Sequence, residues 1–421
     1  MADASSDRRI ALLSLGCRVS RADLDAVAAA VDGRLAVARP GEGASCVVVA
    51  TCTLTADADA AARQAIRRAA REHPGAPIVA MGCYAARDPA ALAALPGVTA
   101  VVGARGEGTL GEVLSALGLR AASGAASGRL ARHTRPFLKV QDGCDARCAY
   151  CVVPLARGPS RSVPLAEAVA RVEALAAAHR EVVLTGVHLG AYGRDLSPRA
   201  SLSELVQAAA ARGPRTRLRL SSVEPLELPL ELLSDPAAAP ALCPHLHLPL
   251  QSGSDRILAA MRRPYGAARY GEIVREAVRR LPGACIGADV LTGFPGETDA
   301  DHRATLSLVE ALPLAYLHVF PFSPRPGTEA AGMGDAVPAG VARARAGELR
   351  AVSERRWRAF VDGLVGRDVE VVVERVEDGI ARGTAREYAT VRWRSRGAAR
   401  GAIARVRVAG REDDVAVGVE V

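Results

Sequence analysis

The stretch Asp142-Gly-Cys-Asp-Ala-Arg-Cys-Ala-Tyr-Cys-Val-Val-Pro154 carries three cysteines in a C-x3-C-x2-C spacing. It directly follows residues 137–141, an apolar run that predicts a β-strand. Three thiolates can ligate three irons of a 4Fe-4S cluster and leave the fourth iron open. An open iron can chelate the amino and carboxylate groups of S-adenosylmethionine and deliver an electron to its sulfonium. We therefore predict that Cys144, Cys148 and Cys151, the central trio, hold a catalytic 4Fe-4S cluster.

Zinc is the main alternative metal for these three thiols. A zinc ion normally takes four protein ligands, so His133 or His188 would have to supply the fourth. The aromatic Tyr150 just before the last cysteine and the barrel-like pattern around the motif favour the iron-sulfur cluster.

Strand-like and helical patterns alternate on both sides of the central trio. Between about residues 135 and 355, six apolar runs are each followed by a helical stretch: 137–141, 181–185, 217–221, 245–250, 285–291 and 316–320. Such a repeat predicts a partial or full α/β barrel, in which the chemistry gathers at the carboxyl ends of the strands.

Three more cysteines, the upstream trio of Cys17, Cys52 and Cys83, each follow an apolar strand-like run directly. The alternating pattern up to about residue 125 predicts a parallel sheet, and the carboxyl ends of parallel strands face one edge. A second three-cysteine cluster at that edge is one interpretation, and three separate buried thiols are the other. Buried structural thiols are the favoured interpretation of Cys46, Cys243 and Cys285.

Composition excludes several classes of protein. The chain has 421 residues, of which 49% are hydrophobic and 24% charged, as expected for about three globular domains. The apolar run at residues 10–15 is too short for a secretory signal, and no apolar stretch long enough to cross a membrane follows. We therefore expect a cytoplasmic protein without a membrane partner, in which nine cysteines indicate metal binding or catalysis before disulfides.

The C-terminal segment, after about Trp357, is rich in valine and arginine. Alternation such as Val369-Glu-Val-Val-Val-Glu374 predicts a small β-barrel. From Arg382 to Arg407 there are eight arginines and one acid, Glu387, a local charge of +7. This charge is compatible with a polyanionic partner such as RNA. A linker is expected at residues 121–128.

With both trios in place, the chain resembles the methylthiotransferase family of radical S-adenosylmethionine (SAM) enzymes over essentially its whole length. Besides the central trio, the resemblance rests on Leu15-Gly-Cys17, Thr51-Cys-Thr53, Gly82-Cys-Tyr84, His247-Leu-Pro-Leu-Gln-Ser-Gly-Ser-Asp255, Gly293-Phe-Pro-Gly-Glu297 and Phe320-Pro-Phe-Ser-Pro-Arg-Pro-Gly-Thr328.

The resemblance implies an α/β architecture of three domains. These are an N-terminal methylthiotransferase domain with a parallel sheet at 1–125, a radical SAM (βα)6-type partial barrel at 126–355 and a TRAM-like RNA-binding β-barrel at 356–421. It also implies two 4Fe-4S clusters, with the auxiliary one on the upstream trio. SAM would serve both to methylate a sulfur on that cluster and to generate a radical at the central trio. A flavodoxin- or ferredoxin-like electron donor is the implied redox partner.

The branches of this family differ in substrate. One acts on isopentenyl-adenosine in tRNA, one on an aspartate of a ribosomal protein, and one on N6-threonylcarbamoyladenosine next to the tRNA anticodon. The segment Cys151-Val-Val-Pro-Leu-Ala-Arg-Gly-Pro-Ser-Arg-Ser162 resembles the third branch, as do Gly16-Cys-Arg-Val19 and Met261-Arg-Arg-Pro-Tyr265. Some positions depart from the family pattern: Ser20 and Ala50 replace expected asparagines, Leu155 a tyrosine and Val163 an arginine.

Candidate binding residues complete the prediction. Near expected strand ends, the residues that could bind SAM are Tyr150, Gly186, Ser222, Glu224 and Gln251. For the tRNA anticodon loop, the candidates for phosphate contacts or base stacking are Arg386, Tyr388, Arg392, Trp393 and Arg394. Turn, packing or barrel-core roles are the alternatives for each. A non-catalytic iron-sulfur RNA-binding protein is disfavoured because it would need no open iron.

Overall fold

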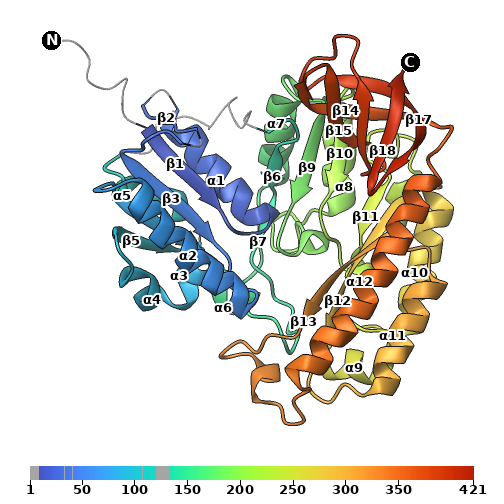
Figure 1. The fold of residues 1–421 in the computed structure, drawn as a ribbon, viewed down its shortest axis with the longest axis horizontal. Coiled ribbons are helices and arrows are strands. Elements are labelled where there is room, and N and C mark those ends of the chain that lie inside the picture. Colours follow the sequence, from blue (N-terminus) through green and yellow to red (C-terminus); the bar gives the residue numbers. More distant parts are fainter. Residues whose placement is uncertain (1–8, 33, 40, 107, 120–132) are drawn as a thin grey trace.

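The structure is a computed structural model that describes residues 9–32, 34–39, 41–106, 108–119 and 133–421 (Figure 1). The N-terminal sheet, drawn in blue, lies beside a larger central barrel, and a small C-terminal barrel, drawn in red, sits at one end of the central one. The expected linker at 121–128 lies outside the described residues. No helix in the described part of the chain is long and apolar enough to span a bilayer.

The N-terminal sheet has five parallel strands in the order β2-β1-β3-β4-β5. Its strands are β1 (Arg9–Ser14), β2 (Ala36–Val37), β3 (Cys46–Thr51), β4 (Ile78–Gly82) and β5 (Val98–Gly103). Its helices are α1 (Arg18–Val31), α2 (Ala56–Glu72), α3 (Cys83–Arg87), α4 (Pro89–Ala93) and α5 (Thr109–Ala116). Alternation along β3 explains the layers, because Val48 packs with α1 and α5 while Val47 and Val49 pack with α2. Helices therefore cover both faces of the sheet, so a functional site can lie only at its edges.

The central domain has six parallel strands in the order β6-β9-β10-β11-β12-β13, with isolated bridges such as Ser222 to His247 joining its two halves. The strands are β6 (Phe137–Lys139), β9 (Glu181–Thr185), β10 (Arg217–Leu220), β11 (His245–His247), β12 (Cys285–Thr292) and β13 (Tyr316–Pro321). The helices are α6 (Val153–Arg157), α7 (Leu165–Ala176), α8 (Leu202–Arg212), α9 (Asp255–Ala260), α10 (Ala267–Arg280), α11 (Asp299–Ala311) and α12 (Ala339–Asp362), and a short hairpin pairs β7 (Gln141–Asp142) with β8 (Arg161–Ser162). This arrangement confirms the predicted partial barrel.

Alternate residues of the barrel strands face opposite sides. On β13, Leu317 and Val319 belong to the same apolar cluster as residues of α12, whereas Tyr316 and His318 contact histidines of β11. Polar side chains are thus left on the inner side of the strands, where a barrel enzyme places its substrate.

The C-terminal domain is a closed barrel of strands in the order β14-β15-β16-β18-β17, as the alternating valines predict. Its strands are β14 (Asp368–Glu377), β15 (Ile380–Ala385), β16 (Thr390–Arg394), β17 (Ile403–Glu412) and β18 (Val415–Glu420). The expected boundary between residues 355 and 356 falls inside α12, which continues to Asp362 because Trp357 and Phe360 on its last turns pack against the barrel core. The junction is therefore at residues 363–367.

Candidate functional site

The upstream trio gathers at one edge of the N-terminal sheet. β1, β3 and β4 are neighbours, and Cys17, Cys52 and Cys83 follow their carboxyl ends. Burial raises the pKa of the Cys83 thiol to about 11, and the charges of Cys17 and Cys52 add to that rise. Burial also raises the pKa of Cys52, with a further contribution from Cys17. The three thiols therefore lie close enough to repel one another as thiolates, which bound metal would relieve.

The central trio lies on the loop between β7 and α6. Burial raises the pKa of Cys151 to about 12, and the neighbouring charges of Cys148 and Cys144 act in the same direction. The backbone N–H of Cys151 donates to the carbonyl of Cys148 at 3.1 Å, which closes the loop into a tight turn. These three cysteines are partly buried and lie on one short loop.

The spacing of the thiols distinguishes a cluster from a single zinc ion. A zinc ion bonded to sulfur at about 2.3 Å requires ligand atoms within about 4 Å of one another. Within the described residues, the one group of histidine, cysteine and acidic side chains spaced for a single ion is His247, Asp289 and His318. Neither trio is spaced for a single ion in this structure.

The two histidines that zinc would have needed have other partners. The Nδ1 atom of His188 is 3.4 Å from the Sγ atom of Cys144, and its Nε2 atom is 2.6 Å from the carboxylate of Glu227. His133 Nε2 instead bonds Asp25 on α1 at 3.1 Å. His188 is thus a hydrogen-bonding neighbour of the central trio.

In each trio, one cysteine sulfur accepts a hydrogen bond from an arginine. Arg263 Nη1 donates to Cys148 Sγ at 3.3 Å, and Arg157 Nε donates to Cys83 Sγ at 3.1 Å. Both guanidinium groups are buried, with 2% and 1% of their side chains exposed. Positive charge and N–H groups directed at the sulfurs stabilise an anionic iron-sulfur centre and tune its potential.

Arg157 also ties the two domains together. Its Nη1 atom donates to both carboxylate oxygens of Asp142, at 2.8 and 3.0 Å, and its Nη2 atom donates to Asp23 of α1 at 3.0 Å. Burial by itself would raise the pKa of Asp142, but the charges of Arg157 and Lys139 outweigh it and hold that pKa at about 2. Asp142 is only two residues before Cys144, so this network links the loops of both trios.

The predicted SAM residues are only partly brought together. A pocket of about 420 Å³ beside the central trio is lined by Cys148, His188, Glu224 and Arg263 among others. Of the predicted residues only Glu224 lines it, where it forms an ion pair with Arg263.

The other four predicted SAM residues lie near the strand ends but outside that lining. Tyr150 is partly buried near Arg263 and Cys148, and desolvation raises its pKa well above the usual range. A Cβ at Gly186 would lie 2.8 Å from the side-chain oxygen of Gln141, so close packing requires glycine there. Ser222 is exposed and bridges to His247. Gln251 has a φ of 71° and donates its backbone N–H to the carbonyl of Asp289 at 2.8 Å.

The predicted RNA contacts of the C-terminal barrel divide into two groups. Trp393 is 2% exposed in the barrel core, so the expectation that it stacks on a base is wrong, because its position on β16 points inward. Arg386 also turns away from solvent and donates to the carbonyls of Pro240 and Leu242 in the central domain. Arg392 and Arg394 are exposed on the outer side of β16.

Tyr388 lies where the three domains meet. Its ring stacks on His245 of the central barrel with centroids 3.9 Å apart, and its hydroxyl accepts from Arg18 Nη2 at 3.0 Å. A base-stacking role is therefore replaced by a contact between domains.

Sequence reasoning missed the roles of Arg157, Arg263 and Asp23. Arg157 and Arg263 do occur in the segments that resemble the threonylcarbamoyladenosine branch, which was a usable signal. Nothing in the pattern around Asp23 distinguishes it from other acids on an amphipathic helix. His188 was noticed only as a candidate zinc ligand.

Comparison with known proteins tests this assignment. Residues 138–309 match the radical SAM superfamily, and residues 9–103 match the uncharacterized protein family UPF0004. The chain is 35% identical to the threonylcarbamoyladenosine tRNA methylthiotransferase MtaB of Aquifex aeolicus, over 87% of this chain and 92% of that protein. The chain belongs to the radical SAM methylthiotransferase family. It is an enzyme whose radical SAM domain implies a 4Fe-4S cluster and SAM.

Other relatives within the family carry different substrate names. MtaB of Bacillus subtilis is 33% identical over 87% of this chain and 84% of its own length. The tRNA-2-methylthio-N(6)-dimethylallyladenosine synthase of Clavibacter michiganensis is also 33% identical, over 88% of this chain and 73% of its own length. Identity at this level does not separate the two substrates.

A solved structure shares the fold of this methylthiotransferase. The radical SAM methyltransferase TsrM of Kitasatospora setae, with tryptophan and a SAM analogue bound, superposes with a TM-score of 0.55 at 19% identity, over 77% of this chain and 75% of that one. The likeness supports the architecture of an N-terminal α/β domain joined to a radical SAM domain.

Proposed function

We propose that this enzyme converts N6-threonylcarbamoyladenosine next to the tRNA anticodon into its 2-methylthio derivative. The observation that carries the proposal is the segment from Ala156 to Arg161, which resembles the threonylcarbamoyladenosine branch and bears Arg157, the residue in contact with both trio loops. The MtaB proteins of Aquifex and Bacillus, which match 87% of the chain, support the same substrate.

The residues fit two iron-sulfur clusters. The central trio would hold the cluster that binds SAM, and the upstream trio would hold an auxiliary cluster. When bound, these groups supply reductive cleavage of SAM and the sulfur that is transferred. The donor set suits them because each site offers three cysteine thiols without a disulfide, a spacing too wide for one ion and an arginine directed at a sulfur.

Side chains of this protein would bind SAM and tRNA and position the reacting groups. Glu224 and Arg263 form the charged wall of the pocket beside Cys148, where an amino acid with both an ammonium and a carboxylate group would find partners. The Arg157 network holds the two trio loops in one geometry, which positions the reacting groups. Arg392 and Arg394 would contribute phosphate contacts with tRNA.

The decisive experiment is nucleoside mass spectrometry of tRNA from a strain that lacks the gene. We expect 2-methylthio-N6-threonylcarbamoyladenosine to disappear and its precursor to accumulate, and complementation with the wild-type gene to restore it. An unchanged level of the modified nucleoside would refute the proposal.

A second candidate substrate is dimethylallyl-adenosine in tRNA. It is favoured by the Clavibacter michiganensis synthase, which matches this chain at the same 33% identity as the Bacillus MtaB protein. Loss of 2-methylthio-dimethylallyladenosine from the tRNA of the same strain would identify dimethylallyl-adenosine as the substrate.

A further inference from the structure

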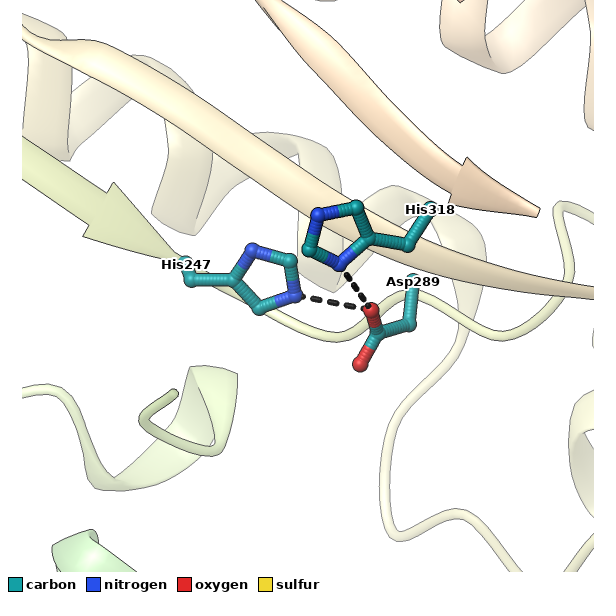
Figure 2. A group of neighbouring side chains, drawn as sticks. All are labelled: His247, Asp289 and His318. Carbon is teal, nitrogen blue, oxygen red and sulfur yellow. Dashed lines mark hydrogen bonds and ion pairs between the residues drawn. The ribbon is translucent and has the colours of Figure 1, made fainter. Parts of the chain in front are cut away.

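The inner side of the central barrel carries a compact polar group at the level where the strands end. His247 Nε2 lies 2.8 Å and His318 Nδ1 3.2 Å from the Oδ1 atom of Asp289. Burial alone would raise the pKa of Asp289, but His247 and His318 hold it well below the usual range, so the carboxylate is ionised and both rings donate an N–H to it. Figure 2 shows that both bonds end on the same oxygen and that the second oxygen points away from both rings.

An exposed aromatic ring follows on the same strand. Phe320 is 44% exposed, the most exposed of the phenylalanine, tyrosine and tryptophan side chains of the described residues. Its ring meets His318 edge to face, with centroids 6.4 Å apart, and therefore lies on the same side of β13. A ring this exposed is not held by core packing, so its face is available to a bound molecule.

Residues that follow Phe320 in the chain contact the loop that carries Cys52 of the upstream trio. Beyond Phe320, Ser323 accepts from the backbone N–H of Ala56 at 3.0 Å, and Arg325 donates to Thr53, the residue after Cys52, at 2.8 Å.

On its other side, the site is connected to the central trio by a series of contacts between neighbouring residues. His247 bridges to Ser222, and Glu224 two residues further on pairs with Arg263, which contacts Cys148. A molecule bound at Phe320 and Asp289 would therefore sit between the two reacting centres.

We propose that Phe320, His318 and Asp289 form the binding site for the target purine base, which rests on the proposed action on tRNA. Phe320 and the edge of His318 provide the surface on which a splayed-out base stacks. The second oxygen of Asp289 accepts an N–H of the base, while His247 and His318 hold the carboxylate in place. A divalent cation is the competing occupant of the His247, Asp289 and His318 group, but it would leave the adjacent exposed ring of Phe320 without a role.

The test is a binding cycle with the full-length enzyme carrying both clusters. Two anticodon stem-loops are compared, one with the target adenosine and one with an abasic site at that position. Wild-type enzyme should bind the intact stem-loop at least about fivefold more tightly, the ratio that stacking of one base supplies. Phe320→Ala should reduce this ratio to about one, and Phe320→Tyr, which keeps the ring, should restore it.

Further variants exclude indirect effects. Asp289→Asn, which preserves the shape of the side chain, should also lower the ratio, and Val341→Ala, an exposed apolar truncation on α12, should leave it unchanged. Retention of the full ratio by Phe320→Ala, or its loss when a chelator is added to the wild-type enzyme, would overturn the base site. Failure of wild-type enzyme to bind either stem-loop would instead contradict the proposed action on tRNA.

Discussion

Arg157 of the central domain places its Nε atom 3.1 Å from the Sγ atom of Cys83 in the N-terminal domain. The same guanidinium group holds Asp142 and Asp23, so one buried cation connects the loops of the two trios. Breaking a buried ion pair on one side leaves uncompensated charge, which costs about 3–5 kcal/mol. Arg157 therefore contributes directly to the geometry between the two trios.

Replacing Arg157 tests that dependence. Arg157→Met should lower methylthiolated product by at least about tenfold, because a shift of about 1 Å at a reacting centre costs more than that. It should also change the electron paramagnetic resonance spectrum of the reduced auxiliary cluster, a signature that a purely structural defect elsewhere would not produce. Arg171→Met, which removes an exposed arginine paired with Glu167 on the same helix, is the matched control. Identical spectra and product yields for Arg157→Met and wild type would contradict the role assigned to Arg157.

The two trios should be separable by mutation. Cys144→Ala should abolish 5′-deoxyadenosine formation, whereas Cys83→Ala should retain it and lose only the methylthio product. Reconstituted wild-type enzyme should contain about eight irons per chain and each variant about four. Cys243→Ala, which changes a buried cysteine outside both trios, should keep full iron content and activity. Persistent 5′-deoxyadenosine in Cys144→Ala would mean that the central trio is misassigned.

Glu181 should make stability depend on acid. Burial alone would raise the pKa of Glu181, but Arg219, Arg217 and Arg135 lower it to about 2. Because this folded-state pKa lies below the unfolded value of about 4.3, the stabilisation is complete above pH 4.3 and is lost as the pH falls toward 2.

The size of that effect can be measured by urea unfolding followed by circular dichroism. Glu181 should contribute about 3 kcal/mol at pH 7, and the difference in unfolding free energy between wild type and Glu181→Gln should shrink between pH 4 and pH 2. Glu173→Gln alters an exposed carboxylate paired with Arg212 and should show no such change. A difference that stays constant with pH would indicate that Glu181 acts by packing alone.

Trp393 should matter for stability and not for RNA binding. Its ring fills the core of the C-terminal barrel, so Trp393→Ala should destabilise that barrel by about 3–5 kcal/mol. The milder Trp393→Phe keeps most of the packing and should bind tRNA with wild-type affinity. Weaker tRNA binding by Trp393→Phe at temperatures where the barrel is folded would restore the stacking interpretation.

Arg394 should contribute to RNA binding through charge. Arg394→Ala should weaken tRNA binding similarly for all sequences and reduce the slope of log affinity against log salt by about one. Arg386→Ala should affect the barrel's attachment to the central domain instead, because that side chain bonds Pro240 and Leu242. An unchanged salt slope in Arg394→Ala would indicate that Arg394 on β16 does not contact RNA phosphates.

Short-range pattern was enough for the architecture of this protein. Apolar runs predicted β1, β3, β4 and the six barrel strands within a few residues, since alternation and run length are local properties. The strand β5 was not predicted, nor were β2, β7 and β8, whose two residues each carry no periodic signal. The expected domain boundary at residue 355 lies inside α12, which shows no break where the barrel begins to cover it.

Spacing along the chain by itself predicted the central trio as a cluster site. The rule that parallel strands end at one edge brought the upstream trio together, and the family resemblance indicated that it holds a second cluster. Only the tertiary structure decided that Arg157 bridges the two trios, that Trp393 faces inward and that Phe320 faces outward into the barrel mouth. Burial and charge pairing depend on contacts between segments far apart in the chain, such as Arg157 with Cys83, and no local pattern encodes them.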